Sequence, residues 1–387
     1  GTFTGCEVMT LNNLASKSQL APAVATLSDG SVVATWTTND TDNGEGTDVM
    51  FRRFDTSLTV MSGFGQEQPA AQISTKNQLG PAIASLPGDS ARFVIAWHTT
   101  DDSTDADSDV RFMVFGADGA PELATEVTVS ESSHPQRDAS VTALPDGRFV
   151  VAWTEVLANP DLMARLFAAD GTPVGDVITV ADGDGGQRGP LSATLDSGDV
   201  ALAWRDGSNV VASVHAVGAD GLLPAALAGP MLVNDIETSG EQLPTGLIGT
   251  AEGGFLIAWQ DNYTGDHDGN KRDIRARRFD TSLGALVTPF VLSGGLAGNQ
   301  ESARLARLPT GFLVCFEQDQ EIIARHFLAD DSPATTGPFA DGLQLVSEEA
   351  NNHEVPVCAA VGGLAAIVWQ AHVDGLAWQI HARVVEP

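Results

Sequence analysis

Short apolar runs alternate with turn-forming residues along this chain, and they do so in a repeating unit. The first copy spans residues 21–36: an apolar run, an Asp29-Gly30 turn, and a nearly continuous apolar run that ends at Trp36. Two β-branched runs joined by Asp-Gly are the strongest local signal for a β-hairpin. The second run has almost no polar position, which predicts a strand buried on both faces.

The unit returns six more times, at a period of roughly 50–60 residues. Most copies continue with a third strand that begins at an acidic residue, as in Asp48–Phe54 and Asp273–Phe279, and with a short fourth strand such as 70–74 or 126–130. Seven copies of four strands predict an all-β fold, a seven-bladed β-propeller of four-stranded antiparallel blades that forms one domain over residues 1–387. The blades are centred on Trp36, Trp97, Trp153, Trp204, Trp259, Phe316 and Trp369.

The two ends of the chain are expected to share one blade. The seventh copy stops after its third strand, and residues 1–13 contain a segment, 6–11, that matches the pattern of a fourth strand. We therefore expect the N-terminal strand to be the outer strand of blade 7, which closes the ring and leaves no open sheet edge between the ends.

Two recurring residue types are expected to hold the blades together. The aromatic anchors are best explained as packing between blades, since replacing a buried Trp by Ala typically costs about 3–5 kcal/mol. An Arg also recurs in the third strand, and we expect it to hydrogen-bond a neighbouring blade. Its copies are Arg52, Arg165, Arg277, Arg325 and Arg383.

The repeat resembles that of uncharacterised bacterial propeller proteins that are secreted or displayed on the cell surface. The matching residues are 253–260, which read Gly-Gly-Phe-Leu-Ile-Ala-Trp-Gln, and 277–280, which read Arg-Arg-Phe-Asp. The resemblance covers essentially the whole chain and implies an extracellular binding or adhesion module. It indicates the fold more specifically than the function, because propellers carry many unrelated activities.

Charge and composition narrow the range of partners. The net charge of −31 argues against binding to nucleic acid or to an anionic membrane surface, since both need a positive surface. No apolar run approaches the ~18 residues of a membrane helix, and no signal peptide is evident. We expect an extracellular or cell-surface monomer. Cys6 allows a lipoprotein anchor as a weaker alternative, and Cys315 and Cys358 are expected to be buried thiols, with a disulfide between them as the alternative.

A Gln precedes the first strand of six copies, on the side where the loops from strand four to one and from strand two to three project. These residues could line a polar funnel that binds a ligand, or they could serve the blades by binding loop backbone groups. The positions are Gln19, Gln78, Gln136, Gln187, Gln242 and Gln300, with His353 in the seventh copy.

Acidic loops follow the aromatic anchor in copies 1, 2 and 5. Alternating Asp and Asn around a turn-forming Gly supply the hard oxygen ligands that Ca²⁺ prefers, although none of the loops matches an EF-hand. Bound Ca²⁺ and simple solvated loops are both compatible with this pattern. The predicted ligands are Asp266, Asp268, Asn270 and Asp273, followed by Asp40, Asp42, Asp101, Asp105 and Asp107.

Catalytic motifs are missing: there is no Gly-x-Ser-x-Gly and no His-Glu-x-x-His. The favoured function is a non-enzymatic binding propeller for a glycan or a protein, with Tyr263 and Trp378 as aromatic rings on which a sugar could stack. One alternative is a polysaccharide lyase or glycoside hydrolase that uses Tyr263, His267 and Arg272. Another is a structural spacer within a larger surface protein.

Overall fold

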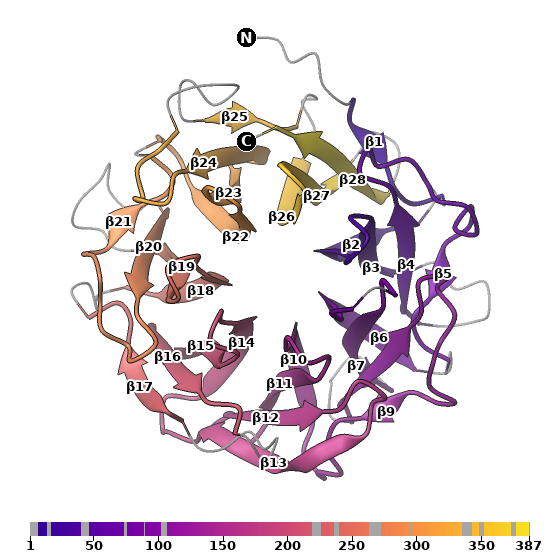
Figure 1. The fold of residues 1–387 in the computed structure, drawn as a ribbon, viewed down its shortest axis with the longest axis horizontal. Helices are drawn as coiled ribbons and strands as arrows, with labels where there is room; N and C mark the ends of the chain where they lie inside the picture. Colours follow the sequence, from indigo (N-terminus) through magenta and orange to yellow (C-terminus); the bar gives the residue numbers. More distant parts are fainter. Residues whose placement is uncertain are drawn as a thin grey trace.

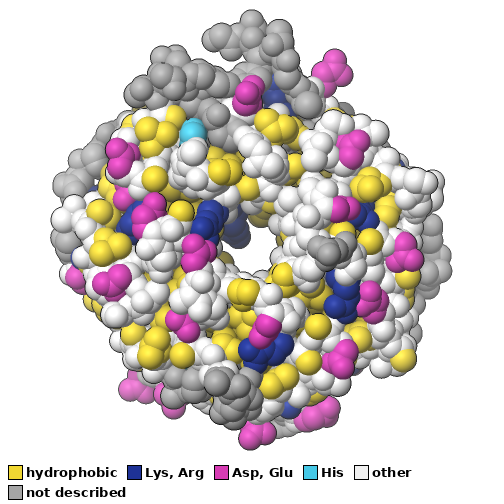
Figure 2. Space-filling view, in the orientation of Figure 1, with side chains coloured by type: hydrophobic (Ala, Val, Ile, Leu, Met, Phe, Trp, Pro, Cys, Tyr) yellow, Lys and Arg dark blue, Asp and Glu magenta, His cyan; other side chains and the backbone are white. Residues whose placement is uncertain are grey.

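The computed structural model describes residues 7–13, 17–39, 46–72, 76–88, 90–101, 107–218, 226–235, 240–262, 272–294, 296–334, 343–347, 352–372 and 377–386. These residues form seven four-stranded antiparallel sheets. The sheets stand around a central opening that passes through the molecule (Figures 1 and 2). The predicted seven-bladed β-propeller is confirmed. Within the described residues, no helix is long and apolar enough to span a bilayer.

Each blade runs from an inner strand at the central channel to an outer strand at the rim (Figure 1). Blade 1 is β2 (Gln19–Thr26), β3 (Val32–Thr38), β4 (Asp48–Phe54) and β5 (Gln68–Pro69). Blade 2 is β6 (Asn77–Ser85), β7 (Phe93–Thr100), β8 (Asp109–Phe115) and β9 (Val127–Thr128). Blade 3 is β10 (Gln136–Ala143), β11 (Phe149–Glu155), β12 (Asp161–Phe167) and β13 (Pro173–Ala181). Blade 4 is β14 (Gln187–Thr194), β15 (Val200–Asp206), β16 (Asn209–His215) and β17 (Ala228–Leu232).

The remaining blades follow the same order. Blade 5 is β18 (Gln242–Gly249), β19 (Phe255–Asp261), β20 (Asp273–Phe279) and β21 (Phe290–Val291). Blade 6 is β22 (Gln300–Leu308), β23 (Gly311–Gln318), β24 (Glu321–Phe327) and β25 (Gln344–Leu345). Blade 7 is β26 (Asn352–Val361), β27 (Leu364–His372), β28 (Trp378–Val385) and β1 (Met9–Thr10).

Most outer strands are shorter than the sequence indicates. The segment 126–130 contributes only Val127–Thr128, and the outer strand of blade 1 lies at Gln68–Pro69, just before the expected segment 70–74. Strong twist rotates successive strands of a blade away from one another, so the rim strand stays within pairing distance for only a short length.

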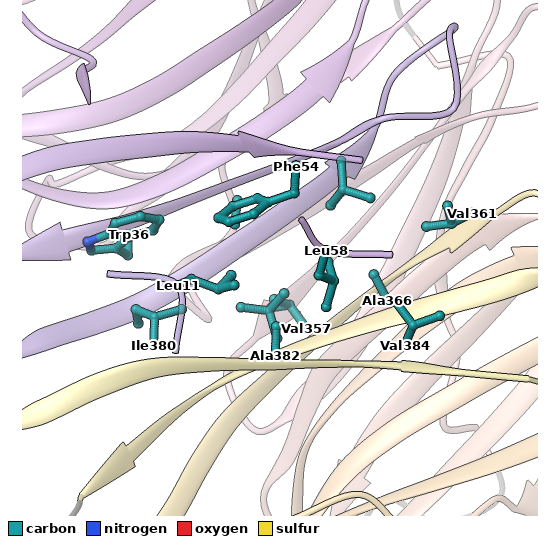
Figure 3. Packing of buried hydrophobic residues seen from close by; sticks show 13 residues of the cluster. Leu11, Trp36, Phe54, Leu58, Val357, Val361, Ala366, Ile380, Ala382 and Val384 are labelled. Atoms are coloured by element: carbon teal, nitrogen blue, oxygen red, sulfur yellow. The ribbon is translucent and has the colours of Figure 1, made fainter. Parts of the chain in front are cut away.

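One hydrophobic cluster fills each of the seven interfaces between neighbouring blades. Every aromatic anchor lies at most 1% exposed and packs against the preceding blade, as Trp36 does against residues of blade 7 such as Ile380 and Ala382 (Figure 3). The middle strands are buried on both faces because a blade lies on either side of them. The anchors therefore have the packing role that the sequence predicts.

The recurring Arg of the third strand links neighbouring blades, as expected. Each guanidinium donates to a backbone carbonyl beside the outer strand of the preceding blade. For Arg277 the acceptor is Val233 O (3.1 Å), and for Arg383 it is Val346 O (3.0 Å). The other three acceptors are Leu11 O for Arg52, Val129 O for Arg165 and Leu292 O for Arg325.

The ring closes where the sequence predicts. Strand β1 pairs antiparallel with β28, with Met9 opposite Ala382 and Thr10 opposite His381. Just beyond β1, Asn12 bonds to Ile380 N–H (2.8 Å) through its carbonyl oxygen and to Gln379 Oε1 (2.7 Å) through its amide nitrogen. Leu11, 1% exposed, completes the cluster between blades 7 and 1.

Candidate functional site

The predicted ring of Gln residues lies inside the blades. All six Gln side chains and His353 are at most 2% exposed and occupy the first or second position of an inner strand. Gln78 Oε1 accepts from Val49 N–H (3.3 Å) and Gln136 Oε1 from Val110 N–H (3.2 Å), each across a blade interface. In blade 7, His353 Nδ1 accepts from the indole of Trp369 (3.1 Å). This burial favours the alternative that these residues serve the blades over a funnel lining.

A backbone irregularity lies two residues after each Gln. In six blades the residue at that position has a positive φ, and the pairing of the inner strand with the second strand slips there. This is the behaviour of a β-bulge, which bends a strand and redirects its side chains. The six residues are Ala21 (φ 49°), Gly80 (60°), Asp138 (56°), Gly189 (61°), Ser302 (54°) and Val355 (50°).

In four blades the side chain that follows the aromatic anchor binds the bulge of the next blade. Gln370 Oε1 accepts from Ala21 N–H (3.0 Å), Thr154 Oγ1 from Gly189 N–H (3.2 Å) and Gln260 Oε1 from Ser302 N–H (3.4 Å). Glu317 accepts from Val355 N–H in the same way. The position after the anchor thus holds the inner strand of the neighbouring blade in place.

That position also forms a cross-strand pair with the residue that follows the Gln. We call these seven pairs the mouth pairs, because they lie where the inner strands begin, at one mouth of the channel. Their composition varies strongly from blade to blade. In blade order they are Leu20/Thr37, Leu79/His98, Arg137/Thr154, Arg188/Arg205, Leu243/Gln260, Glu301/Glu317 and Glu354/Gln370.

A cavity of about 360 Å³ opens among the mouth pairs of blades 4 and 5. It is bounded by blades 3 to 6, and seven of its ten lining residues are polar or charged. Cavities of this size hold small ligands in other proteins, for which about 300–1,000 Å³ is usual. The lining residues are Asp138, Arg188, Gly189, Arg205, Leu243, Pro244, Thr245, Gln260, Ser302 and Arg304.

The carboxylates of blades 6 and 7 form an acidic group beside this cavity. Burial, followed by repulsion from Glu354 and Glu301, raises the pKa of Glu317 to about 7. The N–H of Val355 and the charge of Arg272 oppose this rise. Arg272 itself binds Glu301 (2.6 Å). Glu317 is therefore partly protonated at neutral pH.

Many predicted metal ligands and catalytic residues lie outside the described residues. Asp101 and Asp107 lie within the described part of the chain, and both bind Lys76 Nζ (3.2 and 3.4 Å). Asp273 begins β20 and accepts from Ser293 Oγ (3.3 Å). The described residues contain no group of three or more His, Cys, Asp or Glu that could hold a metal. The positions outside the described ranges are Asp40, Asp42, Asp105, Tyr263, His267, Asp266, Asp268 and Asn270.

Cys315 and Cys358 are neighbours across the interface of blades 6 and 7, and both are free thiols. Burial and the adjacent Cys358 thiol raise the pKa of Cys315 well above its usual value. Trp378, half-buried, packs edge-on against His372 with the ring centroids 5.3 Å apart. It lies in blade 7, away from the blades that line the cavity.

The sequence interpretation missed the Arg residues that line the cavity. The signal was present in the repeat: the mouth pair of blade 4 consists of two arginines, Arg188 and Arg205, whereas the pairs of the other blades contain at most one, Arg137 in blade 3. Comparing the seven copies position by position would have found them.

No family model matches the chain, and no curated protein sequence is similar to it. Several solved structures share its fold. Polysaccharide lyase Uly1 has a TM-score of 0.56 at 8% identity over 99% of this chain and 100% of that chain. A protein of unknown function from Dyadobacter fermentans DSM 18053 has a TM-score of 0.55 at 10% identity, over 99% and 98%. The Hadza microbial sialidase Hz136 has a TM-score of 0.52 at 12% identity, over 95% of this chain and 66% of that one. At these identities the likeness shows the fold alone.

Proposed function

We propose that this chain is a non-enzymatic, extracellular propeller that binds a carbohydrate in the cavity at the channel mouth. The observation that carries the proposal is the lining of that cavity. Guanidinium, amide, hydroxyl and carboxylate groups converge on a space of about 360 Å³. Sugars present many hydroxyls, and such planar polar side chains can donate to them and accept from them. The fold is also that of a polysaccharide lyase and of a sialidase, which makes a carbohydrate the first ligand class to test.

The test is a glycan array followed by titration of each hit. Binding should be lost or weakened at least tenfold by Gln260→Ala, whose amide lines the cavity. A matched control is Gln66→Ala, on an exposed Gln of blade 1 that does not line the cavity, which should leave binding unchanged. If the array gives no hit, a protein ligand or the spacer role replaces this proposal.

A second candidate, a polysaccharide-degrading enzyme, is favoured by one observation. A carboxyl with a pKa of about 7 exchanges protons readily at neutral pH, and Glu317 stands opposite Glu301. Release of product from a polysaccharide panel, abolished by Glu317→Gln, would establish this candidate. No release by the wild type would remove it, and equal release by the variant would mean that Glu317 is not its catalytic acid.

Support by Ca²⁺ is a separate proposal that rests on the Asp-rich loops. A ligand that binds only the folded protein raises its melting temperature. We expect a Ca²⁺-specific rise relative to excess chelator and to Mg²⁺, reduced by Asp266→Ala or by Asp40→Ala. Identical melting curves in all three conditions would leave the loops as solvated acidic surface.

A further inference from the structure

Arg304 is charged at a position where the repeat needs no charge. It faces Cys315, the residue before the anchor of blade 6, and every blade has a residue in this register. The other six are small or apolar. They are Ala23, Ala82, Ser140, Leu191, Gly246 and Val357. The fold therefore does not account for the guanidinium in blade 6.

The Arg304 guanidinium is largely buried in the cavity wall without a carboxylate partner. The guanidinium donates to two carbonyls, Thr245 O and Ala303 O, both at 2.9 Å from Nη1. Among the described residues it forms no ion pair. Burial lowers its pKa, yet an Arg side chain stays protonated at neutral pH. Because buried charges in proteins are usually paired, an unneutralised guanidinium in a cavity wall calls for an anion.

The mouth pair of blade 4 adds two more guanidinium groups. Arg188 and Arg205 stand directly opposite each other, and like charges at such positions destabilise a sheet. Arg188 is exposed and has no hydrogen-bond or ion-pair partner among the described residues. Arg205 binds Glu241 (2.7 Å) and Gly207 O (2.6 Å).

The contact between blades 4 and 5 explains how Arg205 is tolerated. In blades 3, 5, 6 and 7 the residue after the anchor accepts from the bulge N–H of the next blade, which Arg cannot do because it is donor-only. Here the next blade carries Pro244, which has no N–H to satisfy. This hydrogen bond is therefore not needed between blades 4 and 5, and the Arg205 side chain lies in the cavity wall instead.

Two acidic residues lie close to these arginines, and neither neutralises all of them. Asp138 accepts from Thr154 Oγ1 (3.1 Å) and lies 4.0 Å from Arg137 Nε. Glu241 binds Arg205. Arg188 and Arg304 keep their charge, so the cavity is a positive site within a chain of net charge −31.

We propose that the cavity binds the carboxylate of an acidic saccharide of the uronate class between Arg188 of blade 4 and Arg304 of blade 6. Arg–carboxylate hydrogen bonds are charge-assisted and often bidentate, which gives both affinity and orientation. Gln260 and Thr245 lie between the two arginines on blade 5 and supply partners for ring hydroxyls. This inference rests on the proposed carbohydrate-binding function and names the chemical class of its ligand.

The test compares acidic oligosaccharides with their methyl esters, which differ only in the charged group. Calorimetric titration would use trigalacturonate, triguluronate and trimannuronate, each beside its ester. We expect at least one acid to bind ten or more times tighter than its ester. Added salt should weaken the binding of that acid. Arg188→Gln should reduce its affinity ten- to a hundredfold, and Arg304→Gln should do the same if its melting curve stays cooperative.

Arg148→Gln is the matched control, because it removes the same charge from the opposite end of an inner hairpin, where Arg148 binds Asp146. It should change the affinity less than twofold. The inference would be overturned if the acids bind no better than their esters. It would also be overturned if Arg188→Gln and Arg148→Gln reduce the affinity for the acid equally. If either result is obtained but the array shows binding of neutral glycans, the proposed function is retained and only the acidic ligand class is rejected.

Discussion

Glu317 accepts a hydrogen bond that joins two blades, although the charged form of its side chain is unfavourable at this position. It takes the position that binds the bulge of the next blade, where Gln370 and Gln260 do the same work as neutral amides. A carboxylate there faces Glu301 and Glu354, so burial and repulsion both favour its protonated form. The repeat does not require that charge.

The Glu317→Gln variant should stabilise the protein in a pH-dependent way. The folded pKa of about 7 exceeds the ordinary 4.5, so the stability linked to this proton is present below about pH 4.5 and is lost as the pH rises to about 7. Gln keeps the acceptor for Val355 N–H and does not titrate. We expect the variant to gain about 1 kcal/mol over the wild type between pH 4.5 and 8, after allowing for the partial exposure of the carboxylate.

Urea unfolding at pH 4.5, 6 and 8 would measure this gain. Glu354→Gln is a useful comparison, because it removes one repelling charge and should lower the pKa of Glu317. A gain that is constant across this pH range would contradict the assignment of the raised pKa.

Among the structural elements, the inner-strand bulge departs most from what the sequence indicates. The strands follow from local patterns: apolar runs, Asp-Gly turns and a repeating aromatic residue are visible without a structure. The bulge residues share no such signature, since Ala21, Asp138 and Val355 occupy the same conformation. Their positive φ is imposed by pairing between strands and contact between blades, which a single chain read in order does not show. The cavity depends on the same contacts, so it was not predicted either.

Val355 offers a direct test of strain in the bulge. A β-branched residue at φ 50° is unfavourable by about 1–2 kcal/mol, whereas Gly tolerates that region freely and occupies it in blades 2 and 4. Val355 is only partly buried. We therefore expect Val355→Gly to raise the free energy of unfolding by about 0.5–1 kcal/mol. Val357→Gly, two residues along and in regular pairing, should instead lower it, and a loss of stability in both variants would argue against strain.

The whole molecule depends on the closure of blade 7. Leu11 fills the interface between blades 7 and 1, and its neighbours from blade 7 lie at the other end of the sequence (Figure 3). Replacing a fully buried Leu by Ala usually costs about 2–5 kcal/mol. We expect Leu11→Ala to lower the free energy of unfolding by that amount in a denaturant titration. The control, Leu227→Ala, alters a side chain that is 59% exposed and should cost less than about 0.5 kcal/mol. Equal effects would mean that β1 contributes little to the closed ring.

The pairing of β1 with β28 also sets how the ring responds to mechanical load. The two strands are antiparallel, so the chain enters β1 beside the place where it leaves β28. A pull that separates Glu7 from Glu386 therefore strips the backbone bonds of this pair one after another, instead of loading them together. Tethered at both ends, the ring would open first at blade 7 and under small forces; tethered at one end, it would bear no tension across this joint.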